Sequence, residues 1–133
     1  MIVDASAILA VVLDEADSMT FVEALRRPDV RRMSSINFVE AGIRADNDPD
    51  PDRGVAFDKA IHAFRIFVQD VSPYQAMIAR DAYRRFGRGN HPARLNLGDC
   101  FAYALAKARR EPLLFKGNDF AHPDVLAEIE PAL

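Results

Sequence analysis

Short apolar runs alternate along this chain with longer segments in which apolar residues recur every three or four positions. The short runs predict buried strands, and the longer segments predict amphipathic helices. Four runs are expected to form strands, at residues 1–3, 30–33, 66–71 and 113–115. The helices are expected between and after them: through 7–12, from 17 or 18 to just before 28, from 34 or 35 onward, through 55–64, from 73 onward and over 97–110.

Strands that alternate with helices in this way predict a parallel sheet covered by helices on both faces. We therefore expect an α/β fold, a three-layer α/β/α sandwich around a central parallel sheet of about four to five strands. The length of 133 residues fits one compact domain spanning 1–133, and the apolar content of 50% argues against disorder.

The charge balance changes this picture little. The chain has 17 basic and 20 acidic residues and a formal net charge of −3, which does not indicate nucleic-acid binding over the whole surface. Cys100 is the only cysteine, so no disulfide can form within the chain, and this fits a reducing cytoplasm. The first residues lack the basic segment of a signal peptide, and no stretch approaches the ~20 apolar residues that span a bilayer.

Four acidic residues lie where a charge is costly. Asp4 ends the first apolar run, Asp119 follows the last one, and Asp99 begins a helix that is apolar almost all round. Glu40 shares a helical stripe with three apolar residues, Ile36, Val39 and Ile43. An unpaired buried carboxylate is strongly destabilising or takes up a proton. Four of them together predict a divalent cation, because such ions prefer oxygen ligands.

The expected topology brings these acids to one place. The carboxyl ends of parallel strands meet at one edge of the sheet, and ligands of open α/β folds bind there. Asp4 and Asp119 are expected at the ends of two strands, and Glu40 and Asp99 near the starts of helices at the same edge. The four carboxylates are therefore expected to converge.

Each acid also has a purely structural explanation. Asp99 lies three residues after Asn96 and fits the first turn of a capped helix equally well. Glu40 would pair with a buried arginine, Asp4 would cap the helix that follows it, and Asp119 would be a turn residue. These explanations lose weight because all four would have to hold together at one edge of the sheet.

The acids lie in four segments: Met1-Ile2-Val3-Asp4-Ala5-Ser6-Ala7, Asn37-Phe38-Val39-Glu40-Ala41, Leu95-Asn96-Leu97-Gly98-Asp99-Cys100-Phe101-Ala102-Tyr103-Ala104 and Lys116-Gly117-Asn118-Asp119-Phe120. Together these segments resemble the motifs of PIN-domain nucleases, and more closely those of VapC-type toxins of bacterial toxin–antitoxin pairs. They occur in the order and spacing of that family and cover essentially the whole chain.

The resemblance implies an endoribonuclease that needs Mg²⁺ or Mn²⁺. Asp4, Glu40 and Asp99 match the metal-binding acids of the family, and Asp119 matches its fourth acid. Some relatives have an acid at the position of Asn118, where the amide offers an oxygen without a charge. The resemblance also implies an RNA substrate, a cognate VapB-type antitoxin that covers the acidic cleft, and a homodimer formed through apolar helix faces.

Further residues are candidates for binding the RNA. Arg84, Arg88 and Arg94 lie in the most basic stretch of the chain and would contact phosphates, although a solvated helix face explains such a run as well. Ser6 would bind a phosphate or a metal-coordinated water. Lys116 would either touch a phosphate or simply be exposed.

Two other functions fit parts of the pattern. An α/β phosphatase would use Asp4 as its nucleophile, but such enzymes usually need a dedicated lysine, and Ser6 stands where many of them have a second acid. A non-catalytic PIN-like module would bind RNA or protein. Degenerate members of that kind are expected to lose acids, and this chain keeps all four.

Overall fold

Four strands form one parallel sheet in the computed structural model, which describes residues 1–133. In chain order they are β1 (Ile2–Val3), β2 (Arg31–Ser34), β3 (Ile66–Gln69) and β4 (Leu113–Leu114). Their order across the sheet is β3-β2-β1-β4, so the strands that precede Asp4 and Asp119 are neighbours. The register pairs Val3 with Leu114, so β1 and β4 end at the same level of the sheet.

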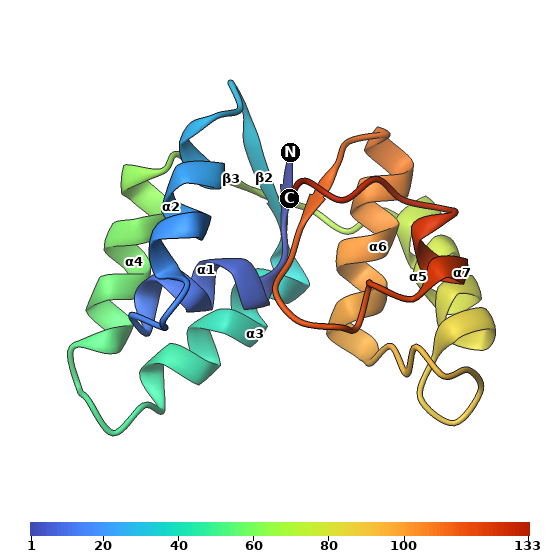
Figure 1. Ribbon diagram of the computed structural model, residues 1–133, viewed down its shortest axis with the longest axis horizontal. Coiled ribbons are helices and arrows are strands. Elements are labelled where there is room, and N and C mark those ends of the chain that lie inside the picture. Colours follow the sequence, from blue (N-terminus) through green and yellow to red (C-terminus); the bar gives the residue numbers. More distant parts are fainter.

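Seven helices connect and cover the strands: α1 (Ala5–Val12), α2 (Ser18–Arg26), α3 (Ser35–Asp46), α4 (Arg53–Ala63), α5 (Pro73–Phe86), α6 (Leu97–Arg109) and α7 (Pro123–Leu126). Figure 1 shows the sheet between two helical layers, with α1 to α4 on one side and α5 to α7 on the other. This arrangement confirms the predicted three-layer α/β/α sandwich, with four parallel strands in the middle.

The two faces of the sheet bury different cores, because neighbouring residues of a strand point to opposite sides. Ile2 and Leu113 belong to a cluster with residues of α5, α6 and α7. Val3 and Leu114 belong to a second cluster with residues of α1, α2, α3 and α4. All four side chains are completely buried, so two short strands hold both helical layers.

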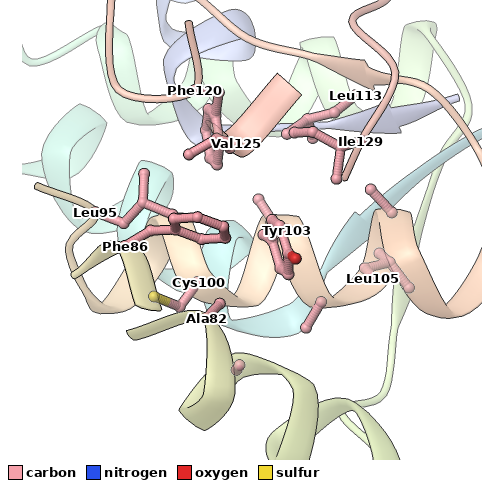
Figure 2. Close-up of a cluster of buried hydrophobic side chains, with 14 of the residues drawn as sticks. Ala82, Phe86, Leu95, Cys100, Tyr103, Leu105, Leu113, Phe120, Val125 and Ile129 are labelled. Atoms are coloured by element: carbon pink, nitrogen blue, oxygen red, sulfur yellow. The ribbon is translucent and has the colours of Figure 1, made fainter. Parts of the chain in front are cut away.

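The cluster on the α5–α6 face also anchors the chain after β4. Phe120 and Val125 lie together on one side of this cluster, across from Phe86 and Tyr103 (Figure 2). The Phe120 ring is buried and lies 5.2 Å from the Phe115 ring, centroid to centroid. The burial of Phe120 limits where the preceding residue, Asp119, can lie.

β3 and β4 end earlier than predicted because their neighbouring strands end. β3 stops at Gln69 and not at residue 71, since Gln69 pairs with Ser34, the last residue of β2. β4 stops at Leu114 and not at residue 115, since Leu114 pairs with Val3, the last residue of β1. In both cases the neighbouring strand gives way to a helix, so no partner is left for a longer ladder.

The predicted helix starts agree with the structure. Ser34 Oγ accepts a hydrogen bond from Ile36 N at 3.3 Å at the start of α3. Ser72 Oγ accepts one from Gln75 N at 3.1 Å at the start of α5, with proline in the first turn. α7 was not predicted, because its four residues are too few to show an apolar repeat.

The two edges of the sheet differ. The outer edge of β4 bonds to the C-terminal segment, since Leu113 N donates to Glu130 O and Ala132 N donates to Leu113 O, both at 2.8 Å. The outer edge of β3 has no strand beside it, and its residues Phe67 and Val68 are exposed. None of the helices is long and apolar enough to cross a membrane.

Candidate active site

Asp4 directly follows β1 and caps α1. Its Oδ2 accepts hydrogen bonds from Ser6 N at 3.0 Å and from Ser6 Oγ at 2.5 Å. The residue is 4% exposed, and its Oδ1 is buried without a hydrogen-bond partner. The structural explanation, a helix cap, is therefore correct, but it uses only one of the two carboxylate oxygens. Leaving the other buried and unpaired costs free energy.

Ser6 links Asp4 to the loop after β4. Its hydroxyl donates to Asp4 Oδ2 and accepts a hydrogen bond from Lys116 N at 2.9 Å. A serine hydroxyl has a single proton, and Asp4 takes it. Ser6 thus orients Asp4; it can still accept a bond from a water, but in this arrangement it has no proton to offer a phosphate.

Asp99 belongs to a capping box at the start of α6. Asn96 Oδ1 accepts a hydrogen bond from Asp99 N at 2.8 Å, and Asp99 Oδ2 accepts one from Asn96 N at 3.0 Å. The residue is 7% exposed. The choice between a helix cap and a metal ligand is therefore not exclusive, because the cap occupies Oδ2 and leaves Oδ1.

Glu40 comes from α3, and its carboxylate lies against the first turn of α6. A Cβ atom added at Gly98 would overlap this carboxylate. Asn37 Nδ2 donates to Glu40 Oε1 at 3.4 Å and to Gly98 O at 2.9 Å. Glu40 is thus held next to the helix turn that contains Asp99.

The apolar stripe that was expected to bury Glu40 faces outward. Val39 and Ile43 are 53% and 56% exposed, whereas the small residues Ala41 and Ala45 form the buried face of α3. Small side chains let the helix pack closely, and the larger ones are left outside. The prediction that all four acids lie in core-forming segments was therefore wrong for Glu40, and Asp119 is exposed as well.

Asp119 lies in the loop after β4. The backbone forms a turn here, in which Ala121 N donates to Asn118 O at 3.1 Å. The turn explanation thus holds for the backbone. The carboxylate of Asp119 still acts on the site, because its charge raises the pKa of Asp99.

The four carboxylates influence one another. The pKa of Asp99 is raised to about 8, first by burial and then by the negative charges of Asp4, Asp119 and Glu40. The pKa of Asp4 is raised to about 6, again first by burial, while hydrogen bonds from Ser6 oppose the rise. Burial also raises the pKa of Glu40, because its carboxylate end lies against α6 although the residue as a whole is exposed. The structure therefore brings the four acids together at one edge of the sheet.

No cationic side chain neutralises this group. None of the four acids takes part in an ion pair, including the pairing of Glu40 with an arginine that we considered. The nearby Lys116 directs its ammonium group to Glu15 and Asp17 instead. Carboxylate oxygens without a counter-charge are ligands that hard divalent cations prefer, so the donor set fits Mg²⁺ or Mn²⁺.

A tighter group of ligand atoms lies elsewhere. His91, His122 and Asp124 have ligand atoms within 4.8 Å of one another, a limit that no three of the four acids meet. However, His91 Nδ1 accepts a hydrogen bond from Ala93 N at 3.0 Å, and His122 Nδ1 accepts one from Asp124 N at 3.2 Å. A neutral imidazole that accepts at Nδ1 carries its proton on Nε2 and has no lone pair left for a metal. This group is therefore explained by hydrogen bonds that join the loop before α6 to α7.

The arginines proposed to bind RNA are exposed at the surface. Arg84 lies 3.5 Å from Asp81, and Arg88 and Arg94 form no ion pair. Arg88 contributes to a cleft of about 400 Å³ beside the start of α6, together with Tyr83, Asn96 and Leu97. Arg88 is therefore close to the helix turn that carries Asp99.

Two residues at the site were not singled out from the sequence. Asn37 precedes Glu40 by one helical turn, and this spacing is the only signal that sequence offers for it. Gly98 lies where α6 contacts α3. Its carbonyl oxygen accepts a hydrogen bond from Asn37, which is 61 residues away along the chain. Sequence spacing carries no information about such a contact.

Comparison with known proteins places this site in a family. Residues 1–126 match the PIN domain. The chain is 51% identical over 126 residues to Ribonuclease VapC28 of Mycobacterium tuberculosis, an alignment that covers 94% of this chain and 95% of the relative. It is 45% identical over 126 residues to Ribonuclease VapC42 of the same organism, with 94% and 96% covered.

Two solved structures share the fold. The chain is similar to VapC20 of Mycobacterium tuberculosis, a sarcin-ricin loop cleaving toxin, with a TM-score of 0.73 and 17% identity over 90% of this chain and 92% of that one. It is also similar to VapBC2 of Rickettsia felis, which was solved with a DNA fragment from its promoter. There the TM-score is 0.72 and the identity 13%, over 97% of this chain and 95% of that one. At these identities the likeness concerns the fold.

Raising the pH should destabilise the cation-free protein through Asp99. Between the ordinary pKa of 3.8 and about 8, folded Asp99 keeps a proton that the unfolded chain has released. The folded state binds more protons in this window, so its stability falls as the pH rises. Asp99→Asn keeps the acceptor oxygen for Asn96 N and removes the charge. We expect this variant to melt a few degrees higher than the wild type, with an advantage that grows from pH about 5 to about 8.

The measurement is thermal unfolding across this pH range in the presence of a chelator. Asp58→Asn, which removes an exposed carboxylate from α4, is the matched control and should show no growing advantage. A difference between Asp99→Asn and the wild type that stays constant with pH would contradict the raised pKa.

Proposed function

This chain belongs to the PIN-domain family, among the VapC ribonucleases, and we propose that it acts as a metal-dependent endoribonuclease, the toxin of a toxin–antitoxin pair. The observation that carries the proposal is the buried, unpaired Oδ1 of Asp4. It lies among three further carboxylates, and no cationic side chain balances their charge. Such a group is costly to maintain unless a cation and a substrate use it.

A divalent cation, Mg²⁺ or Mn²⁺, would be held by the four acids. Asp4 and Asp99 would bind it through the carboxylate oxygens that form no hydrogen bond at the helix starts. Glu40 and Asp119 would add the remaining negative charge around the cation. When bound, the cation supplies Lewis acidity, which makes water a better nucleophile near neutral pH and offsets charge on the phosphoryl group. Asn118 adds an oxygen without a charge, so the chain favours one strong cation site over two.

The chain itself orients the two carboxylates that would bind the cation. Ser6 holds Asp4 Oδ2, and Asn96 holds Asp99 Oδ2. Both acids stand at helix N-termini, those of α1 and α6, and such termini favour negative charge.

Asp99 keeps its proton near neutral pH in the cation-free protein and has to release it on binding a cation. Cation affinity should therefore rise with pH.

The two alternative functions fit less well. A phosphatase would need a lysine beside the Asp4 nucleophile, but the ammonium group of Lys116 is paired with Glu15 and Asp17. A non-catalytic module would have no use for four uncompensated acids, whose mutual repulsion costs stability.

Removing the charge of Asp4, Glu40 or Asp99 should abolish RNA cleavage without unfolding the protein. We expect Asp4→Asn, Glu40→Gln and Asp99→Asn each to lower the cleavage rate by at least about 100-fold, because each change removes a charge that holds the cation. Asp119→Asn should have a smaller effect, since Asp119 lies in the loop after β4, where no hydrogen bond or helix turn holds its carboxylate. The measurement is cleavage of labelled single-stranded RNA with Mn²⁺ or Mg²⁺.

The same assay contains its controls. EDTA should stop cleavage by the wild type, and Asp58→Asn should leave cleavage unchanged. Full activity in EDTA, or normal cleavage at saturating cation by two of the variants at Asp4, Glu40 and Asp99, would overturn the site assignment. RNA that stays intact with the wild-type protein under all conditions would favour the non-catalytic module.

Arg84, Arg88 and Arg94 are proposed to contact the RNA backbone. Two of them have no ion-pair partner, and Arg84 has only a long contact with the exposed Asp81. Their charges are therefore available for phosphates, which position a nucleic acid without specifying its sequence. The cleft beside Arg88 places one of them next to the start of α6.

Neutralising two of these arginines should make RNA binding less sensitive to salt. We expect Arg84→Ala/Arg88→Ala, made in an Asp99→Asn background that does not cut, to bind RNA more weakly and to lower the slope of log affinity against log salt by about 0.7 per lost phosphate contact. Fluorescence anisotropy against salt concentration measures this slope. Arg26→Ala/Arg27→Ala, at the end of α2 and directly after it, removes the same charge and should keep the wild-type slope. Equal slopes for all proteins would show that these arginines do not contact RNA and only form a solvated helix face.

A VapB-type antitoxin is the proposed protein partner. The support is the family, together with the relative from Rickettsia felis that was solved as VapBC2. An antitoxin that presents a basic side chain to the four carboxylates would compete with both cation and substrate.

A reaction on RNA and a single buried thiol, Cys100, fit a cytoplasmic site of action.

Exposed apolar side chains favour a homodimer. Val39 and Ile43 on α3, Tyr74 and Met77 on α5 and Leu97 at the start of α6 are each more than half exposed. α6 contacts both α3 and α5, so these side chains lie on three adjoining helices. Large apolar side chains exposed on adjoining helices support an interaction site here.

A charge placed in this apolar surface should separate the dimer. We expect Met77→Lys, at a residue that is 70% exposed on α5, to elute as a monomer, because a lysine would be desolvated in the interface. Met19→Lys is the matched control, since Met19 is 62% exposed but lies on α2. Light scattering after size exclusion gives the mass of each protein. A wild-type monomer at all concentrations would exclude the dimer.

A further inference from the structure

The carboxylate of Glu40 rests on two residues that carry no role in the reaction proposed above. Asn37, one turn before Glu40 on α3, is 0% exposed, which is unusual for an asparagine. Its amide nitrogen donates to Gly98 O at 2.9 Å and to Glu40 Oε1 at 3.4 Å. An amide group has two protons on nitrogen, so it can make both bonds at once. Asn37 therefore joins α3 to the first turn of α6 and holds Glu40 beside that turn.

Gly98 provides the space for this contact. A Cβ atom at this position would overlap the carboxylate group of Glu40, and the carboxylate is the first group that it would meet. Gly98 directly precedes Asp99, so a contact that fixes Glu40 against Gly98 also fixes it relative to Asp99. The two acids come from helices that are far apart in sequence, and this contact sets their relative position.

We propose that Asn37 and Gly98 are positioning residues that hold the Glu40 carboxylate in place for cation binding. This inference rests on the proposed metal-dependent function. Glu40 has a long side chain on an exposed part of α3, and such a side chain loses rotamer freedom when it binds. The amide of Asn37 and the open backbone at Gly98 fix its carboxylate before the cation arrives. Ligands that are held in place by neighbouring groups bind metals more tightly.

A purely structural role predicts something different. If Asn37 and Gly98 only packed α3 against α6, then Gly98→Ala would leave cation binding unchanged, and it would favour the helix, because alanine has a higher helix propensity than glycine. In the proposed arrangement the new methyl group meets the end of a flexible side chain. The fold then persists while the Glu40 carboxylate is pushed away from Asp99.

The test is Mn²⁺ binding by isothermal titration calorimetry on the full chain, together with a thermal melt of each variant. We expect Asn37→Ala and Gly98→Ala each to raise the Kd for Mn²⁺ about tenfold, which is the size of effect seen when a group that orients a ligand is removed. Cleavage of RNA by both variants should recover toward the wild-type rate at saturating Mn²⁺. Glu40→Gln marks the full loss of this ligand and should weaken binding further.

Ala45→Gly is the matched packing control. Ala45 is buried on the same helix, so the change loosens α3 without touching Glu40, and Mn²⁺ binding should stay at the wild-type level. Unchanged Mn²⁺ affinity in Gly98→Ala would overturn the proposal, as would an equal loss of affinity in Ala45→Gly. Gly98→Ala decides the matter alone if Asn37→Ala does not fold.

The proposed function itself fails in a different way. In that case the wild type would not bind Mn²⁺, or Glu40→Gln would bind it as tightly as the wild type. A third result would overturn only the present inference. In it, the wild type binds Mn²⁺, Glu40→Gln does not, and Asn37→Ala and Gly98→Ala bind it as tightly as the wild type. The proposed metal site would then stand, and Asn37 and Gly98 would have no role in positioning Glu40.

Discussion

Repulsion between like charges at one edge of the sheet is the constraint on which this structure depends. β1 and β4 are neighbours that end at the same level, which brings Asp4 close to the loop that carries Asp119. α3 and α6 add Glu40 and Asp99 to the same edge, and the pKa of Asp99 rises to about 8 as a result of burial and of the other three charges. The remaining fold has to hold these groups together without any basic side chain among them.

Helix caps and buried anchors offset this repulsion. Asp4 and Asp99 each accept backbone hydrogen bonds at a helix N-terminus, where the helix dipole favours a negative charge. Each of these hydrogen-bonding arrangements uses one carboxylate oxygen and leaves the other free. The chain segments that carry the acids are fixed in turn by apolar residues, by the completely buried residues of β1 and β4 and by Phe120 next to Asp119. The site is therefore rigid where charge is buried and more open toward Glu40 and Asp119.

Local spacing made much of this fold and site predictable. The strand before Asp4 and the spacing of Asn96 and Asp99 are short-range patterns, and alternating strands and helices led to the correct layers. The apolar stripe near Glu40 misled us, because periodicity identifies a helix but does not tell which face is buried when small residues such as Ala41 can pack inside. Contacts between residues far apart in the sequence could not be predicted either. An example is the hydrogen bond from Lys116 N to the Ser6 hydroxyl, which joins residues 110 positions apart.

The capping box at the start of α6 makes different substitutions of Asp99 act differently on the fold. An asparagine at position 99 keeps an oxygen that can accept the hydrogen bond from Asn96 N, so the capping box survives the loss of the charge. An alanine at this position loses that bond and keeps only the one from the backbone N–H of residue 99 to Asn96 Oδ1, so half of the capping box is lost. The charge at this position can therefore change while the start of α6 is preserved.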